Sequence, residues 1–108
     1  MCFDPGRLTE IFDLDSAAIR EVLDEAVSSL LELHSKLTGQ LLARNREASI
    51  ALVHEMAGVS GNVGADELCT ISGAILQLLR KAGAALTEVP EDDLQAALGR
   101  FVAAARLY

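Results

Sequence analysis

Apolar residues recur at three- and four-residue steps along most of the chain, which is the spacing of amphipathic α-helices. The longest stripe predicts a helix that is capped by Asp15 or Ser16 and ends near Ala43. Its apolar positions are Ile19, Val22, Leu23, Ala26, Val27, Leu30, Leu33, Leu37 and Leu41. The polar run 44–46 that follows predicts a turn.

Three further helices follow from the same pattern. The second is expected from about Glu47 to Asn62 or Val63, with Gly64 as a left-handed C-terminal cap. Asp66 and Glu67 suit the start of the third helix, and Pro90 suits the first position of the fourth. The third helix is expected to end at Arg80, Lys81 and Gly83.

Each of these three helices carries a set of side chains that is expected to face inward. In the second helix they are Ile50, Val53, Ala57 and Ser60. In the third they are Leu68, Ile71, Ile75, Leu78 and Leu79. In the fourth they are Leu94, Ala97, Leu98, Phe101 and Val102.

Short joints between the predicted helices favour antiparallel neighbours. We therefore expect an all-α fold, an antiparallel up-and-down four-helix bundle with a short extra N-terminal helix from about Pro5 to Phe12. With 108 residues, the chain is expected to be one domain over residues 1–108 and a monomer.

The charge balance narrows the classes of partner. The formal net charge is −7, and an acidic chain lacks the excess of Lys and Arg that neutralises nucleic-acid phosphates or anionic lipids. No apolar run approaches the roughly 18 residues that span a membrane. We therefore expect no nucleic acid and no membrane as partners. The N-terminal MCFDPGRLTE has no signal-peptide pattern, and a cytoplasmic location is expected.

Cofactor and metal chemistry find little support in the residue spacing. Cys2 and Cys69 form no C-x-x-C motif, and with His34 and His54 they show no metal-ligand spacing. The glycines of GVSGNVG do not lie between a strand and a helix, as a dinucleotide fingerprint requires. We expect neither a metal nor a cofactor of the chain's own.

His54 stands in a run that is rich in glycine, 54-HEMAGVSGNVG-64. Glycine inside a helix costs about 1 kcal/mol relative to alanine, so Gly58 and Gly61 indicate a geometric requirement. Gly58 follows His54 by four residues and shares its face, and Gly61 lies one turn further. An exposed imidazole is largely uncharged and nucleophilic at neutral pH, and phosphoryl transfer needs mainly positioning and charge stabilisation. The pattern predicts a nucleophilic nitrogen that another protein can reach. His34 has no such glycines and is interpreted as a boundary residue.

The segment from His54 to Leu68 resembles the signature helix of histidine-containing phosphotransfer (HPt) domains. The family pattern is a His, a hydrophobic residue at plus two, Lys and Gly at plus three and plus four, small residues, and then Gly-Ala before a Leu. The matching residues are Met56, Gly58, Ser60, Gly61, Val63, Gly64, Ala65 and Leu68. The order of the predicted helices agrees with the family over nearly the whole chain.

The resemblance implies that His54 is the phosphoacceptor of a multistep phosphorelay. It would accept a phosphoryl group from a receiver-domain aspartate or a hybrid kinase and pass it to a response regulator. Such a protein is a phosphocarrier and not an enzyme, and the Mg²⁺ of the reaction is expected on the receiver partner. The expected contacts with the receiver are Glu55, Ala57, Gly58, Val59, Gly61, Asn62 and Gln77.

One departure from the family leaves two interpretations open. Ala57 stands where the family usually has a Lys that offsets the charge of the phosphohistidine. Arg80 or Lys81 could take over that role if antiparallel packing brought them to His54. We expect an active carrier, and the alternative is a degenerate docking module that binds and sequesters a receiver without efficient transfer. A complete sensor kinase is excluded, because 108 residues leave no room for an ATP-binding domain.

Overall fold

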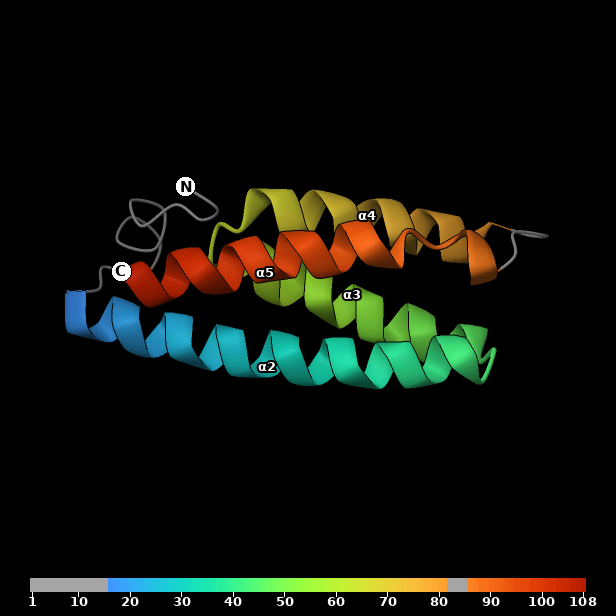
Figure 1. The fold of residues 1–108 in the computed structure, drawn as a ribbon, viewed down its shortest axis with the longest axis horizontal. Helices are drawn as coiled ribbons and strands as arrows, with labels where there is room; N and C mark the ends of the chain where they lie inside the picture. Colours follow the sequence, from blue (N-terminus) through green and yellow to red (C-terminus); the bar gives the residue numbers. More distant parts are fainter. Residues whose placement is uncertain (1–15, 82–85) are drawn as a thin grey trace.

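The computed structural model describes residues 16–81 and 86–108. They form the helices α2 (Ser16–Leu42), α3 (Arg46–Asn62), α4 (Asp66–Arg80) and α5 (Glu91–Leu107), with a short 3₁₀ helix η1 (Leu86–Glu88) before α5. Figure 1 shows α2 to α5 side by side, with α2 extending well past α3. The predicted all-α fold of four antiparallel helices is confirmed. The leading helix that was expected over about residues 5–12 lies outside the described residues.

The order of the helices around the bundle follows their order in the chain. α3 packs against α2 and α4, and α5 packs against α4 and α2. The side formed by α3 and α4 is therefore opposite the side formed by α2 and α5. Within residues 16–81 and 86–108, no helix combines the length and apolar character needed to cross a membrane.

The turn between α2 and α3 is closed by backbone hydrogen bonds. Arg44 adopts a left-handed conformation (φ 57°), and the Asn45 N–H donates to the carbonyl of Gln40 at 2.9 Å. The Asn45 side chain then accepts a hydrogen bond from the Ala48 N–H at 3.1 Å and caps α3. One short segment thus ends one helix and starts the next in the opposite direction.

The turn between α3 and α4 has the same architecture with glycine at the left-handed position. Gly64 has φ 71°, as predicted, and the Ala65 N–H donates to the carbonyl of Ser60 at 2.8 Å. Ala65 and Val63 are buried on either side of Gly64. This turn places the start of α4 directly beside the end of α3.

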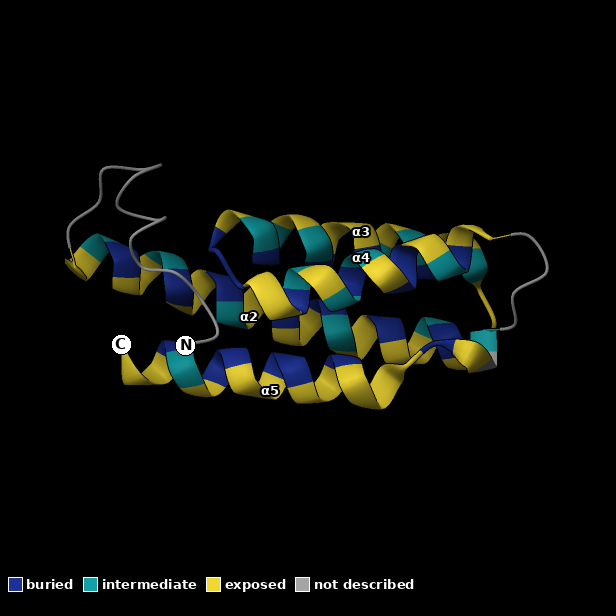
Figure 2. Ribbon diagram, turned by 90° about the horizontal axis from the view of Figure 1, so that it is seen from above, coloured by how far each residue is buried: buried dark blue, intermediate teal, exposed yellow. Residues whose placement is uncertain are grey.

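The core follows the apolar stripes of α2 and α5 closely. In Figure 2 the buried positions run along the inner sides of the helices. Val22 and Val27 flank the buried stripe of α2 as half-buried residues. The other seven predicted positions of α2 and all five of α5 are buried, namely Ile19, Leu23, Ala26, Leu30, Leu33, Leu37, Leu41, Leu94, Ala97, Leu98, Phe101 and Val102.

The predicted inward face of α3 was partly wrong. Val53 and Ser60 are buried as expected, whereas Ile50 and Ala57 are only half-buried. Met56, which was not assigned to the core, is fully buried. The buried arc of α3 therefore runs through Ser49, Val53, Met56 and Ser60, at steps of three and four residues, and is rotated away from Ile50 and Ala57.

Serines contribute to the buried faces of both α3 and α4. Ser49 and Ser60 are fully buried, and their hydroxyls donate to the carbonyls of Asn45 and Met56 at 2.8 and 2.7 Å. A hydroxyl that bonds within its own helix can be buried at low cost. In α4, Ser72 and Leu76 are buried, whereas the predicted Ile71 and Leu78 are half-buried. The remaining predicted residues of α4 are buried, namely Leu68, Ile75 and Leu79.

Candidate functional site

His54 lies in the middle of α3, on its solvent side. Its side chain is exposed, while Val53 and Met56 on the other side of the helix are fully buried. The ring is therefore carried by a well-anchored turn and is accessible to a partner. The exposed residues of α3 around it are Ala51, Glu55, Gly58 and Asn62, and we call them, with His54, the His54 face.

Gly58 leaves open space one turn after His54. A Cβ built on Gly58 would meet no heavy atom within 4 Å outside its own helix turn. The fold itself therefore does not require a glycine at this position, and α3 would gain helix propensity from any other common residue except proline. The absent side chain leaves the surface of α3 one turn after His54 open to solvent.

Gly61 and Ala57 lie on the side of α3 that faces α4. A Cβ on Gly61 would approach the Cys69 sulfur to 3.5 Å, which is an ordinary contact. The Cys69 sulfur also lies 3.6 Å from the carbonyl oxygen of Ala57. Cys69 thus covers the α3 backbone between these two residues, and the half-buried Ala57 and Gly61 form the α4 edge of the His54 face.

The register of α3 against α4 separates His54 from the basic residues of α4. The Arg46 guanidinium donates to the carbonyl oxygen of Leu79 at 2.6 Å, which places the end of α4 beside the start of α3. His54 follows Arg46 by eight residues, or about 12 Å along the helix axis at 1.5 Å per residue. The suggestion that Arg80 or Lys81 replaces the missing lysine therefore finds no support in this packing.

The charged side chains of α3 and α4 between residues 47 and 79 are all acidic. Residues 47–79 contain no Lys and no Arg, but they include Glu47, Glu55, Asp66 and Glu67. Glu67 pairs with Arg100 of α5 at 2.7 Å, on the side of α4 that faces α5. In the described part of the chain, the His54 face is thus neutral to acidic.

The remaining predicted contact residues are distributed unevenly. Val59 packs partly against the core and does not belong to the exposed face. Gln77 is exposed on α4, closer to the Arg46 end than His54 is. The expected residues Glu55, Gly58 and Asn62 are exposed with His54 on α3.

Sequence reasoning missed one residue that borders this face. Gly73 lies one turn after Cys69 on α4, on the same side, and by the register of the two helices it is level with His54. A Cβ on Gly73 would also meet no heavy atom within 4 Å. No signal in the sequence could have found it, because its relation to His54 depends on how α4 is aligned with α3.

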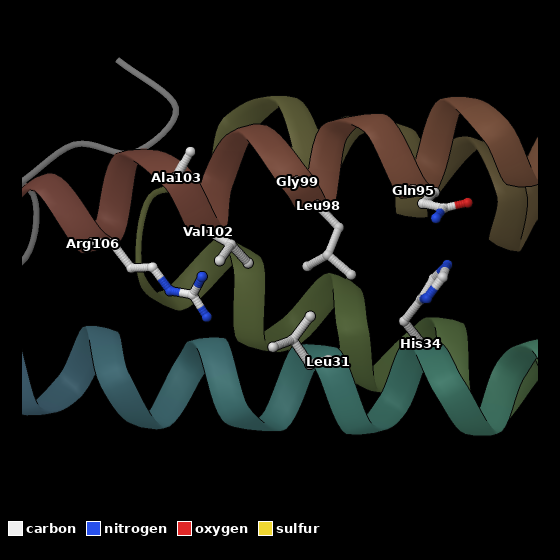
Figure 3. Close-up of a pocket in the computed structure, with 8 residues that line it drawn as sticks. All are labelled: Leu31, His34, Gln95, Leu98, Gly99, Val102, Ala103 and Arg106. Carbon is white, nitrogen blue, oxygen red and sulfur yellow. The ribbon is translucent and has the colours of Figure 1, made fainter.

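His34, the other histidine, lies at a different place. A groove between α2 and α5 is lined by Leu31 and His34 from α2 and by Leu98, Val102 and Arg106, among others, from α5. Figure 3 shows the His34 ring directed towards Gln95 across this groove. His34 is half-buried, in agreement with its interpretation as a boundary residue, and lies on the side of the bundle opposite α3 and α4.

Metal ligands do not gather in the described part of the chain. Across residues 16–81 and 86–108, no three His, Cys, Asp or Glu side chains are placed to hold a metal ion. The chemistry that this site can offer is therefore that of one accessible imidazole.

A comparison with models of protein families shows which family the chain matches. The model of the Hpt domain family matches residues 17–104, a span that includes all four helices up to the last turn of α5. Searches of curated proteins and of solved structures found no match. The family match covers the His54 face in full.

Proposed function

Because the chain belongs to the Hpt domain family, we propose that it is the phosphocarrier of a multistep phosphorelay and that His54 is its phosphoacceptor. Domains of this family act in phosphorelays as carriers and interact with receiver domains. The specific proposal is that a receiver-domain aspartate, or a hybrid kinase, donates the phosphoryl group and that a response regulator accepts it. The observation that carries this proposal is the exposed His54 beside the open position at Gly58.

The transfer step requires little from the chain itself. An imidazole nitrogen of His54 uses its lone pair to form the N–P bond, while the O–P bond of the aspartyl phosphate breaks and its electron pair stays on the carboxylate. The second ring nitrogen keeps its proton. Onward transfer is the reverse step to a second aspartate. The Mg²⁺ that stabilises the phosphoryl charge is proposed to belong to the receiver.

Access is the contribution that the fold makes. In-line transfer needs the donor aspartate, the phosphorus atom and the imidazole nitrogen on one line, so the receiver must approach α3 closely. Gly58 on α3 and Gly73 on α4 present no side chain beside His54. His54 is also held on a turn whose inner side chains, Val53 and Met56, are fully buried.

A second candidate function is favoured by one observation. Ala57 leaves the phosphohistidine without the cation that the family usually provides, and the packing of α4 does not bring Arg80 to its place. A module that binds a receiver and sequesters it without efficient transfer would keep the same exposed face. The two candidates differ only in whether the phosphoryl group moves.

The distinguishing experiment is phosphotransfer from a panel of receiver domains that carry labelled phosphate. An active carrier acquires acid-labile, base-stable label, and the variant His54→Gln does not. The variant His34→Gln serves as the matched control, because it removes the other histidine from the opposite side of the bundle. Receivers that bind without transferring label would support the docking module. If no receiver binds, both candidates fail.

A further inference from the structure

Glu55 is the charged residue closest in sequence to His54, and it is exposed on the same face of α3. In residues 16–81 and 86–108, the Glu55 carboxylate has no ion-pair partner. The nearest cation on its own helix is Arg46, whose guanidinium is bound to the carbonyl of Leu79. Glu55 is thus a negative charge beside the proposed phosphoacceptor that the described part of this chain does not offset.

The basic residues on the α3–α4 side gather at one end of it. Arg44 lies in the turn before α3 and Arg46 at the start of α3, and Arg80 and Lys81 lie at the end of α4 on the same side of the bundle. No cation occurs from residue 47 to residue 79, which includes the whole His54 face. Asp66, at the start of α4, adds a further exposed carboxyl group near the opposite end.

This arrangement determines what a partner surface must carry. A phosphoryl group on His54 adds negative charge on the residue before Glu55, and like charges on neighbouring side chains oppose each other. Water screens the repulsion while the face is exposed, but a docked protein removes part of that water and strengthens it. A partner that places a cation against Glu55 removes the repulsion, whereas an acidic partner surface increases it.

We propose that Glu55 selects the receiver by charge and that the cognate receiver presents a Lys or Arg side chain against Glu55 when it docks on the His54 face. This inference rests on the proposed function, because it assumes that a receiver docks there. It concerns a residue of the contact surface and not a group that touches the reacting atoms. Charge complementarity of this kind mainly sets partner choice and association rate.

The test is a binding titration of each receiver of the panel with the wild type, Glu55→Gln and Glu55→Lys. For the cognate receiver we expect roughly three-fold weaker binding for the neutral variant and roughly ten-fold weaker binding for the reversed charge at low salt. Raising the salt concentration should weaken wild-type binding and reduce the difference between the variants. The matched control is Glu21→Lys, an exposed residue near the start of α2, which with 27 residues is longer than the 17-residue α3, and the expected change is below about two-fold.

The outcomes separate this inference from the proposed function. Equal binding of the wild type and Glu55→Lys at every salt concentration would overturn the inference, even if label still moved to His54. Stronger binding of Glu55→Lys would overturn it as well. If Glu55→Lys weakened receiver binding but no label reached His54 of the wild type, charge selection would stand and the carrier function would fail.

Discussion

Arg46 and Leu79 are 33 positions apart in the chain, yet the Arg46 guanidinium donates to the Leu79 carbonyl oxygen at 2.6 Å. Leu79 lies in the last turn of α4, where carbonyl groups lack partners within the helix. The contact therefore satisfies an exposed helix end and aligns α3 with α4. That alignment places Gly73 level with His54 and keeps Arg80 beside Arg46.

Removing this contact should loosen the α3–α4 pair. For Arg46→Met we expect the free energy of unfolding to fall by about 1–2 kcal/mol, because a hydrogen bond from a charged donor is lost while much of the apolar stem is kept. Denaturant titration measures the change. Arg80→Met, at an exposed neighbouring position, should stay within about 0.5 kcal/mol. Equal losses in both variants would show that the Arg46 contact does not hold the helices together.

Substitutions at Gly58 should affect the stability of the protein and the rate of phosphotransfer differently. Gly58→Ala is expected to raise the free energy of unfolding by up to about 1 kcal/mol, because the added Cβ meets open space inside a helix. Gly58→Gln should lower the rate of phosphotransfer by roughly ten- to a hundred-fold by obstructing the approach to His54. Quenched transfer assays and thermal unfolding measure the two effects.

Gly99 provides the matched control for Gly58. It lies inside α5, is exposed, and has open space around an added Cβ, but it is on a helix that does not carry the His54 face. Gly99→Ala and Gly99→Gln should change stability in the same direction as the Gly58 variants and leave transfer unchanged. Full transfer by Gly58→Gln would refute the role of Gly58 in access to His54.

Substitution of the left-handed residue should change protein stability in opposite directions in the two turns that flank α3. Arg44 adopts φ 57° without being a glycine, so Arg44→Gly should stabilise the protein by up to about 1 kcal/mol. Gly64→Ala should destabilise it by about 1 kcal/mol, because φ 71° disfavours a side chain. Chemical unfolding of both variants tests the pair. A loss of stability in Arg44→Gly would show that the left-handed backbone of Arg44 does not strain the α2–α3 turn.

A lysine at position 57 should restore the missing charge offset. Ala57 is half-buried at the α4 edge of the His54 face, where a long side chain can extend into solvent beside His54. We expect Ala57→Lys to increase the equilibrium fraction of phosphorylated His54 by roughly two- to five-fold, the range of one exposed ion pair. The fraction is measured as labelled protein at equilibrium with a phosphorylated receiver. Ala96→Lys, exposed on α5, is the control, and equal fractions in both variants would exclude a local charge effect.

The four long helices, their approximate ends and the exposure of His54 were accessible from the sequence, whereas the alignment of the helices was not. Apolar spacing alone predicts the buried stripe of α2, because that helix has one broad inner face. α3 is different, because its buried arc includes Ser49, which was not assigned to the core and whose hydroxyl donates to the Asn45 carbonyl. The burial of Met56 in place of Ile50 depends on how α3 is rotated about its axis against α2 and α4, which the pattern of a single helix does not contain.

The residues around His54 on its own helix could be grouped from the sequence, whereas those on the neighbouring helix could not. His54, Gly58 and Gly61 share one helix, so the 3.6-residue period is enough to group them. Gly73 and the distance between His54 and Arg80 depend on the register of α4, which is set by the Gly64 turn and the Arg46 contact. These features are tertiary, and a sequence pattern within one helix cannot contain them.

Locating the phosphate on the protein is the most direct test of whether His54 is the phosphoacceptor. The wild-type chain is incubated with a phosphorylated receiver, kept at alkaline pH to preserve phosphohistidine, and mapped by peptide mass spectrometry. We expect the phosphate on the peptide that contains His54, none on the peptide that contains His34, and none on His54→Gln. Phosphate on another residue, or retained in the His54→Gln variant, would contradict the assignment of His54 as the phosphoacceptor.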